Sequence, residues 1–432
     1  MEWQNATGCK MNSIRYLILI FSLLISILPI SAWNNHAGIT YLILQDHWKS
    51  KPVANVKVES LESFLMKEKN SLAPVLNEAD TFISSKLPHC PIPSNELIFK
   101  PNQIEASTVV PLFFRALRVN PGHKPTLYKQ LANVLAKKPS SILKEITTLH
   151  ELGKLTNESF QPLPVGSSIT PAEILVTAVD EPDYDLDMYL FSDSDSSFGK
   201  VYGFGEQPFG NPKYEFSSQA PFHMGFYHES SLIFTLAGFL KKTYPEYRIY
   251  QFTKLSEHAF KTGHPYWGYR FAGWALHYIQ DLTQPYHSSV LPRVGAGKQI
   301  GVQFLATVGF PGSKEKMIDY ISNRHTLIEE YQYYLIKELL FTKNKDHIVS
   351  KALQTTSGNS SFSISDFDSV RNVISKQAYD AAIEADYEIE QLGILKYEKV
   401  YEENHPIHKI LAKLLANTSS HTRSYLDALK VP

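Results

Sequence analysis

The spacing of apolar residues along this 432-residue chain predicts a mostly helical protein. Apolar positions recur every three to four residues over long stretches, which is the period of a helix with one buried face. We expect helices at 36–48, 57–86, 104–150 (the last two broken by proline-containing links), 229–243, 246–262, 265–283, 313–342, 365–393 and 405–430. The segment 265–283 is apolar on nearly every side, so we expect it to be central and buried.

A long region rich in Ser, Gly, Pro and aromatic residues, 192–222, interrupts this pattern. It is too long for a simple connection, which indicates a functional loop. Its aromatic residues could touch lipid tails or a quaternary ammonium group, or they could only pack the loop onto the body. They are Phe198, Tyr202, Phe204, Phe209, Tyr214, Phe216, Phe222, Phe226 and Tyr227.

The first 32 residues have the pattern of a secretory signal peptide. Lys10 and Arg15 precede an apolar run at 16–30, and the small residues Ser31 and Ala32 follow. A membrane anchor is the alternative, but the run is short for one. We expect cleavage after Ala32, secretion from the cell (with the periplasm as the alternative compartment) and a mature chain that begins at Trp33.

Composition narrows the class of protein further. The chain is 43% hydrophobic and 20% charged, with a formal net charge of −1, which is typical of a soluble globular protein. No block of like charges appears, so we expect no nucleic-acid partner. Removal of the signal peptide leaves Cys90 as the single cysteine, which excludes an internal disulfide; bound metal ions could brace the fold instead.

The stretch WALHYIQDLTQPYHS, residues 274–288, concentrates metal-ligand chemistry. His277 and Asp281 are four residues apart and share one helix face. Pro285 cannot continue that helix, so His287 should lie just past its end. A carboxylate among apolar residues is costly unless it is paired or metal-bound. A core His–Asp hydrogen bond is the alternative interpretation.

A second pair, His325 and Glu329, has the same spacing in the predicted helix 313–342. An i, i+4 pair of histidine and carboxylate can grip a divalent cation from a rigid element, although a solvated helix face is the alternative. Further candidates are the histidines His223 and His228, the N-terminal Trp33 with His36, and an acidic cluster that could equally be a solvated turn. That cluster consists of Asp180, Asp183, Asp185 and Asp187.

Together these motifs resemble those of the zinc-dependent bacterial phospholipases C and the related fungal single-strand nucleases. The resemblance rests on an N-terminal tryptophan after cleavage, on HYIQDLTQPYH with its Gln-Pro pair, and on HTLIE. The order and spacing of these motifs agree with those of the family over most of the mature chain, to about residue 335. Segments 50–165 and 345–432 exceed the short secreted phospholipases and look more like the longer Gram-negative variants.

The resemblance implies an all-α, multi-helix bundle around a trinuclear zinc site, with long loops and a helical C-terminal extension. The implied division is 1–32 as signal peptide, 33–345 as catalytic domain and 346–432 as extension. The implied ligands are Asp180, His223, His277 and Asp281 for one Zn²⁺; His287, His325 and Glu329 for a second; and the Trp33 amine and carbonyl, His36 and the other Asp281 oxygen for a third. Asp183 stays an alternative to Asp180, and His228 to His223.

The function implied by the resemblance is that of a secreted zinc metallophospholipase C, a phosphoric diester hydrolase. It would cleave the glycerol-side phosphodiester bond of phospholipids such as phosphatidylcholine, at a membrane or micelle surface, by means of metal-activated water. Asp180 would accept the proton, and the protein would act as a monomer. One alternative is a single-strand nuclease or 3′-nucleotidase with the same zinc site; another is a secreted zinc-binding protein without catalysis.

Overall fold

The computed structural model of the chain describes residues 33–48, 53–134, 136, 138–210, 215–293, 312–354, 368–392 and 405–429. Within these residues the protein is mostly helical, as the apolar spacing predicts. The signal peptide expected at 1–32 lies outside the described residues. Among the helices that are described, none is both long enough and apolar enough to cross a membrane.

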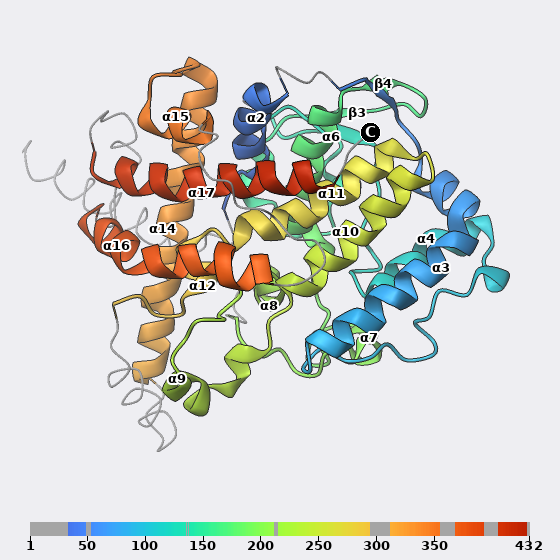
Figure 1. Cartoon of the computed structure of the whole chain (residues 1–432), viewed down its shortest axis with the longest axis horizontal. Helices are drawn as coiled ribbons and strands as arrows, with labels where there is room; N and C mark the ends of the chain where they lie inside the picture. The colour runs from blue at the N-terminus through green and yellow to red at the C-terminus, as the bar shows by residue number, and fades with distance from the viewer. Residues whose placement is uncertain are drawn as a thin grey trace, which may run out of the picture.

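The elements follow one another along the chain as Figure 1 shows. The helices are α2 (His36–His47), α3 (Leu61–Lys86), η2 (Pro101–Gln103), α4 (Ala106–Leu117), α5 (Leu143–Ile146), η3 (Gly153–Asn157), α6 (Pro171–Ala178), η4 (Pro182–Leu186), α7 (Ser197–Tyr202), η5 (Glu215–Gln219), α8 (Ala220–His223), α9 (Ser231–Leu236), η6 (Gly238–Lys241), α10 (Pro245–Lys261), α11 (Pro265–Asp281), α12 (Pro285–Ser288), α14 (Gly312–Thr342), α15 (Ile348–Gln354), η7 (Ser369–Ser375), α16 (Lys376–Leu392) and α17 (Ile407–Ala428). Two short antiparallel pairs join β1 (Val56–Lys57) to β4 (Ser168–Ile169), and β2 (Tyr128–Gln130) to β3 (Phe160–Pro162).

Helix α11 is the buried centre predicted from its apolar surface. Every residue from Tyr266 to Asp281 is buried. The helix packs against α10, α6 and α17. Pro265 begins it, where the missing N–H costs nothing, and Pro285 opens the short helix α12 just beyond its end.

A glycine on α11 sets its distance from α6. A Cβ added at Gly273 would lie 2.5 Å from the Cβ of Ala178, so a larger residue could not be accommodated without movement. The close approach brings the end of α6 to the side of α11 that carries His277. The His277 ring donates from Nδ1 to the carbonyl oxygen of Val179, at 2.7 Å. The acidic segment that follows Val179 is thereby held beside the C-terminal end of α11.

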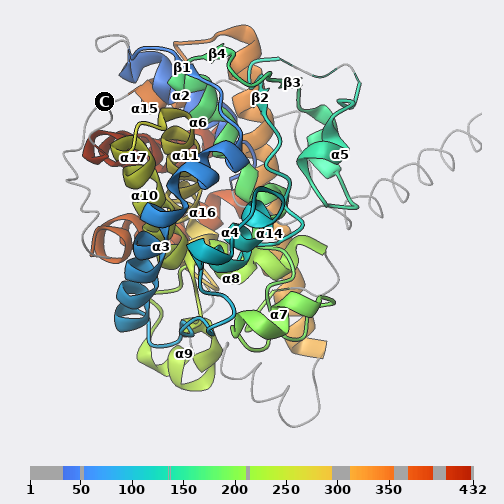
Figure 2. The same ribbon diagram turned by 90° about the vertical axis from the view of Figure 1, so that its right-hand side faces the viewer.

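The C-terminal helices form a second apolar cluster with α2. Side chains of α2, α14, α15, α16 and α17 share it, among them Ile39, Leu335 and Leu411. Helix α17 packs against α15, α2 and α11, and Figure 2 shows α17 next to α11 from a second direction. The division into domains at residue 345 stays a prediction.

Two expected helices are shorter than the pattern predicts. Over 104–150 the structure has α4 and α5, with β2 between them. Arg118 ends α4 in the left-handed region (φ 53°), and Pro121 and Gly122 follow closely, so the apolar spacing beyond this point belongs to turns and strands. Over 229–243 only α9 and η6 form, because Ala237 leaves helical geometry between them.

The aromatic residues of 198–227 pack inward. Tyr202, Phe204 and Phe222 belong to the main hydrophobic cluster, and the described aromatic side chains of this stretch are all buried or half-buried. Of the two interpretations of this loop, packing onto the body is the one that the structure supports. Part of the region is helical, as α7, η5 and α8, and residues 211–214 lie outside the described part of the chain.

Candidate metal centre

The C-terminal end of α11 gathers the first group of donor atoms. His223 Nδ1 lies 2.8 Å from Asp281 Oδ2 and 3.0 Å from His277 Nε2, and His277 Nε2 lies 3.3 Å from Asp281 Oδ2. Asp183 Oδ1 lies 3.7 Å from His223 Nδ1 and 3.6 Å from His277 Nε2. Two ligands of one tetrahedral zinc ion are about 3.3 Å apart. His223, His277 and Asp281 are therefore spaced as the ligands of one cation, and Asp183 lies beside the two histidines.

A second group joins α12 to α14. Glu329 Oε1 lies 2.5 Å from His325 Nε2 and 3.8 Å from His287 Nε2. The i, i+4 spacing of His325 and Glu329 puts both on one face of α14, and α12 presents His287 to that face. All three side chains are buried. This is the grouping expected for the second ion.

Asp281 also faces His36 with its other oxygen. His36 Nε2 lies 3.2 Å from Asp281 Oδ1, whereas Oδ2 of the same carboxylate faces His223 and His277. Asp281 thus reaches two sets of donors, as a bridging ligand must. His36, His277 and Asp183 form a further group with donor atoms within 4.8 Å of one another.

Hydrogen bonds fix which ring nitrogen faces the centre. Nδ1 of His36 lies 2.9 Å from Gln280 Oε1, Nδ1 of His277 donates to Val179, and Nδ1 of His287 lies 2.7 Å from the carbonyl oxygen of His223. An oxygen acceptor requires a proton on Nδ1, so the neutral ring has its lone pair on Nε2. All three imidazoles are therefore set as ligands through Nε2.

Within the described part of the chain, several of these atoms have no partner in hydrogen-bonding geometry although they are shielded from water. They are His36 Nε2, Asp281 Oδ1, His287 Nε2, His325 Nε2 and Glu329 Oε2. Leaving buried polar atoms unsatisfied costs free energy, so such atoms rarely gather without a reason. Cations bound in these groups would satisfy them. Nitrogen and carboxylate oxygen are ligands that suit zinc, and the residues present therefore fit a metal.

The cluster strongly perturbs the pKa values of its members. Burial raises the pKa of Glu329 to about 8 and lowers that of His325 to about 3. Burial opposes protonation of His36 and His223, but carboxylates overcome it. Asp281 raises the pKa of His36 to about 9, and Asp187 with Asp281 raises that of His223 to about 10. Burial also opposes ionisation of Asp281, yet His277, His223 and His36 hold its pKa well below the usual value.

The two open choices between neighbouring ligands have different geometries. His223 belongs to the first group of donors. His228 lies outside the groups, and its Nε2 is 2.8 Å from the carbonyl oxygen of Arg371. Asp183 is among the grouped donors and Asp180 is not. Asp180 accepts from the Ala37 N–H at 2.9 Å and from Gln130 Nε2 at 2.7 Å, so it anchors the first turn of α2. Burial raises its pKa to about 6.

The remaining acidic residues are not a solvated turn. Asp185 and Asp187 are fully buried. Asp185 accepts from Thr148 N at 2.7 Å, and Asp187 pairs with Arg248 at 2.6 Å and accepts from Tyr278 at 2.6 Å. Asp187 Oδ2 also lies 3.5 Å from His223 Nε2, behind the ligand face of that ring. Partners distant in sequence make this arrangement, so local composition could not reveal it.

Sequence reasoning also missed Gln280 and the two threonines of α17 near it. Gln280 Nε2 donates to Thr40 at 2.9 Å and to Thr422 at 3.1 Å, and these bonds orient the amide oxygen that holds His36. Thr418 Oγ1 lies 2.7 Å from Thr283 Oγ1, which accepts from the indole of Trp33 at 3.0 Å. Helix α17 therefore supports the side of the centre formed by His36 and Trp33.

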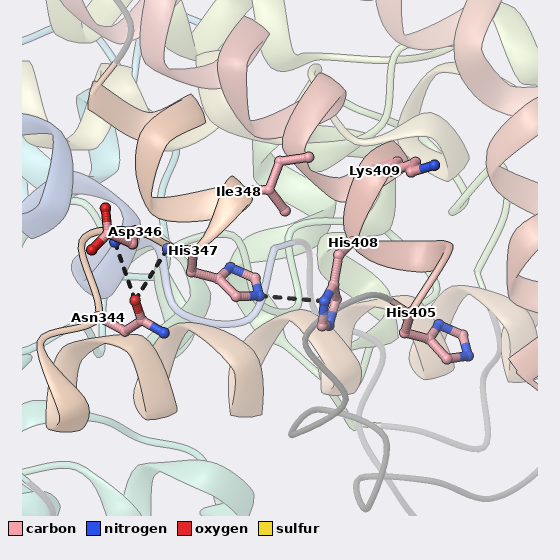
Figure 3. Close-up of a pocket in the computed structure, with 7 residues that line it drawn as sticks. All are labelled: Asn344, Asp346, His347, Ile348, His405, His408 and Lys409. Carbon is pink, nitrogen blue, oxygen red and sulfur yellow. Dashed lines mark hydrogen bonds between the residues drawn. The ribbon is translucent and has the colours of Figure 1, made fainter.

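Another group of histidines lines a pocket of about 370 Å³ between the α14–α15 turn and the start of α17. In Figure 3 His347 and His408 point toward one another, and their Nε2 and Nδ1 atoms are 3.3 Å apart. The backbone N–H of Val349 donates to His347 Nδ1, so the proton of that ring is on Nε2. The contact is therefore an ordinary hydrogen bond between rings, and this group is not set up as a metal site.

Comparison of the chain with protein-family models, with curated proteins and with solved structures returns no match. Function must therefore be inferred from the residues of the centre.

Proposed function

We propose that the protein is a zinc-dependent phosphoric diester hydrolase of the phospholipase C type. The helices would form a bundle around three zinc ions. The observation that carries the proposal is the convergence of five imidazoles and several carboxylates with unsatisfied, buried donor atoms. The matching motif order in the sequence supports zinc as the metal and phosphate esters as the substrate.

The first ion would take His223, His277, Asp281 and Asp183. We assign Asp183 here in place of Asp180 because its carboxylate oxygen lies 3.7 Å from His223 Nδ1 and 3.6 Å from His277 Nε2. The second ion would take His287, His325 and Glu329. The third would take His36, Asp281 and the amine and carbonyl oxygen of Trp33, if the mature chain begins there.

Zinc ions bound in this way neutralise the charge of a phosphate and lower the pKa of a water molecule. The chain's own residues supply rigidity and a proton acceptor. Buried helices hold the imidazoles with their second nitrogens already bonded, so the ligands need not reorganise. Burial raises the pKa of Asp180 to about 6, although the nearby His36 opposes the shift. Such a value suits a group that accepts a proton from attacking water near neutral pH.

A lipid substrate is favoured over a polynucleotide by charge. A strand needs a basic track and stacking surfaces, and the chain has a net charge of −1 with no cluster of Lys and Arg near the ligands in the sequence. A phosphatidylcholine headgroup has no net charge and needs no such track. We therefore propose diacylglycerol and a phosphorylated headgroup as the products, released at a membrane or micelle surface.

The test compares substrates on the purified, zinc-replete protein. We expect release of phosphocholine from phosphatidylcholine vesicles and cleavage of a chromogenic choline phosphodiester. Faster hydrolysis of single-stranded DNA or of a 3′-nucleotide supports the nuclease alternative. Zinc binding without any ester hydrolysis supports the non-catalytic alternative.

A pair of variants on one segment provides the matched control. His223→Ala removes a grouped donor and should lower kcat/KM by about 100-fold or more. His228→Ala removes a nearby histidine that bonds to the Arg371 carbonyl, outside the centre, and should leave activity near the wild-type value. Equal losses in both variants would contradict the assignment.

A further inference from the structure

Lys154 is a buried cation beside the centre with no hydrogen-bond partner among the described residues. It lies on η3, and its Nζ is shielded from water. The nearest carboxylate oxygen, Glu330 Oε1, is 3.7 Å away, and the Tyr333 ring centroid is 5.2 Å away. An ammonium group has three donors, and at this position the long ion pair with Glu330 leaves them without a partner at hydrogen-bond distance among the described residues.

Neighbouring buried cations are satisfied, which distinguishes Lys154 from them. Lys337 donates to Glu158 at 2.7 Å, and the same carboxylate accepts from Tyr333 at 2.9 Å. Arg270 donates to Glu181 at 2.6 Å, within a buried pair. A buried charge without hydrogen bonds costs several kcal/mol in general, so the fold retains Lys154 at a cost that a bound anion could offset.

The charge of Lys154 acts on the metal centre. Burial lowers the pKa of Lys154, and the carboxylates of Glu330, Glu329 and Asp183 oppose that shift; Lys154 in turn opposes the rise that burial causes in the pKa of Glu329. Lys154 and Asp183 keep 15% and 16% of their side-chain surface exposed, whereas Glu329, His277 and Asp281 keep none. Part of the Lys154 stem and of the Asp183 side chain therefore reaches the surface, whereas Nζ of Lys154 lies beneath it.

We propose that Lys154 is a phosphate-binding residue that donates to an oxygen of the substrate's phosphoryl group next to the metal ions. The inference rests on the proposed function for its substrate. A lysine is a compact cation with three donors, and phosphate oxygens are strong acceptors. The ligands hold the ions, while Lys154 contacts only the incoming anion.

The alternative is a purely structural ion pair between Lys154 and Glu330. The two roles predict opposite effects of Lys154→Met, which keeps the apolar stem and removes the charge. Removal of an uncompensated charge should leave the midpoint of thermal unfolding unchanged or raise it. Removal of a structural partner should lower that midpoint.

The experiment measures inorganic phosphate binding to the zinc-loaded protein by titration calorimetry. We expect Lys154→Met to lower the affinity for phosphate by about tenfold or more. Its zinc content and thermal stability should be no lower than those of the wild type. Lys154→Arg should retain most of the affinity. Lys144→Met, at an exposed position on α5, serves as the control and should bind phosphate as the wild type does.

Phosphate affinity also separates this inference from the proposed function. Wild-type affinity in Lys154→Met, or no phosphate binding by the wild type, overturns the role of Lys154 even if the protein hydrolyses phosphodiesters. Weaker phosphate binding in Lys154→Met supports that role. If the wild type then hydrolyses no ester, the proposed function fails while the phosphate site stands.

Discussion

Each imidazole of the centre must be neutral, and each carboxylate ionised, before it can bind a cation. Glu329, His36 and His223 have pKa values of about 8, 9 and 10, all above neutral pH. These three groups therefore hold protons at pH 7 until a cation displaces them. His325, with a pKa of about 3, has no proton to release.

Metal affinity should consequently rise with pH. Between pH 6 and 8 the apparent zinc affinity should increase by about tenfold per pH unit for each proton released. Titration calorimetry at pH 7 in two buffers with different ionisation enthalpies should report more than one proton released per chain. Affinity that is constant over this range would contradict the arrangement of charges described above.

Asp183 and Asp180 should respond differently to the same substitution. Asp183→Asn weakens a ligand of the first ion, so zinc affinity should fall by about tenfold or more. Asp180→Asn should keep its zinc but lose turnover, because the proton acceptor is gone. Zinc content and kcat, measured on both variants, decide the assignment; loss of zinc in Asp180→Asn alone would restore Asp180 as the ligand.

For individual residues, the sequence predicted the ligand pairs that are four positions apart on one helix, and it missed contacts between residues that lie far apart in the sequence. His277 with Asp281 and His325 with Glu329 have helical spacing, so their shared faces follow from the spacing alone. The positions of Asp183 and Lys154 depend on how η3 and the end of α6 pack against α11 and α14. Nothing in the sequence near either residue records that packing.

Among the elements, the helices whose apolar pattern runs without a proline or glycine break were predicted within a few residues of their bounds. Helices α2, α10, α11 and α17 are of this kind. The prediction for 104–150 failed because Arg118 and the Pro-Gly that follows it turn the chain, and short strand pairing replaces the helical period. Period alone cannot distinguish such a turn from a continuing helix.

Helix α17 should affect metal binding although it contributes no ligand. Thr422→Val removes an acceptor from Gln280 Nε2, so the amide loses part of its orientation and His36 part of its support. We expect zinc affinity to fall by up to about tenfold, measured by competition with a chromogenic chelator. Thr422→Ser keeps the hydroxyl group and should match the wild type; equal behaviour of the two variants would exclude this role.

Across the whole molecule, the two apolar clusters meet around the centre. Trp33 belongs to the cluster of the C-terminal helices, is fully buried and donates to Thr283, two residues past Asp281. This places the expected start of the mature chain beside the third group of ligands. The described helices after residue 345 include α15 and α17, which pack directly on α2, the helix that carries His36.

The mature N-terminus should therefore control the number of ions bound. A chain that begins at Trp33 can offer a free amine to the third ion, whereas a chain that retains Ala32 has an amide nitrogen there instead. We expect native mass spectrometry to show one zinc ion fewer in the extended chain. The same number in both forms would remove Trp33 from the ligands and leave the other two groups intact.

The most direct test of the account is the zinc content of the purified mature protein after gel filtration in metal-free buffer, measured by atomic emission. The account predicts three zinc ions per chain, and two when the N-terminus is blocked. Fewer than two tightly held ions would contradict it, because the buried donors of α11, α12 and α14 would then have gathered for some other reason.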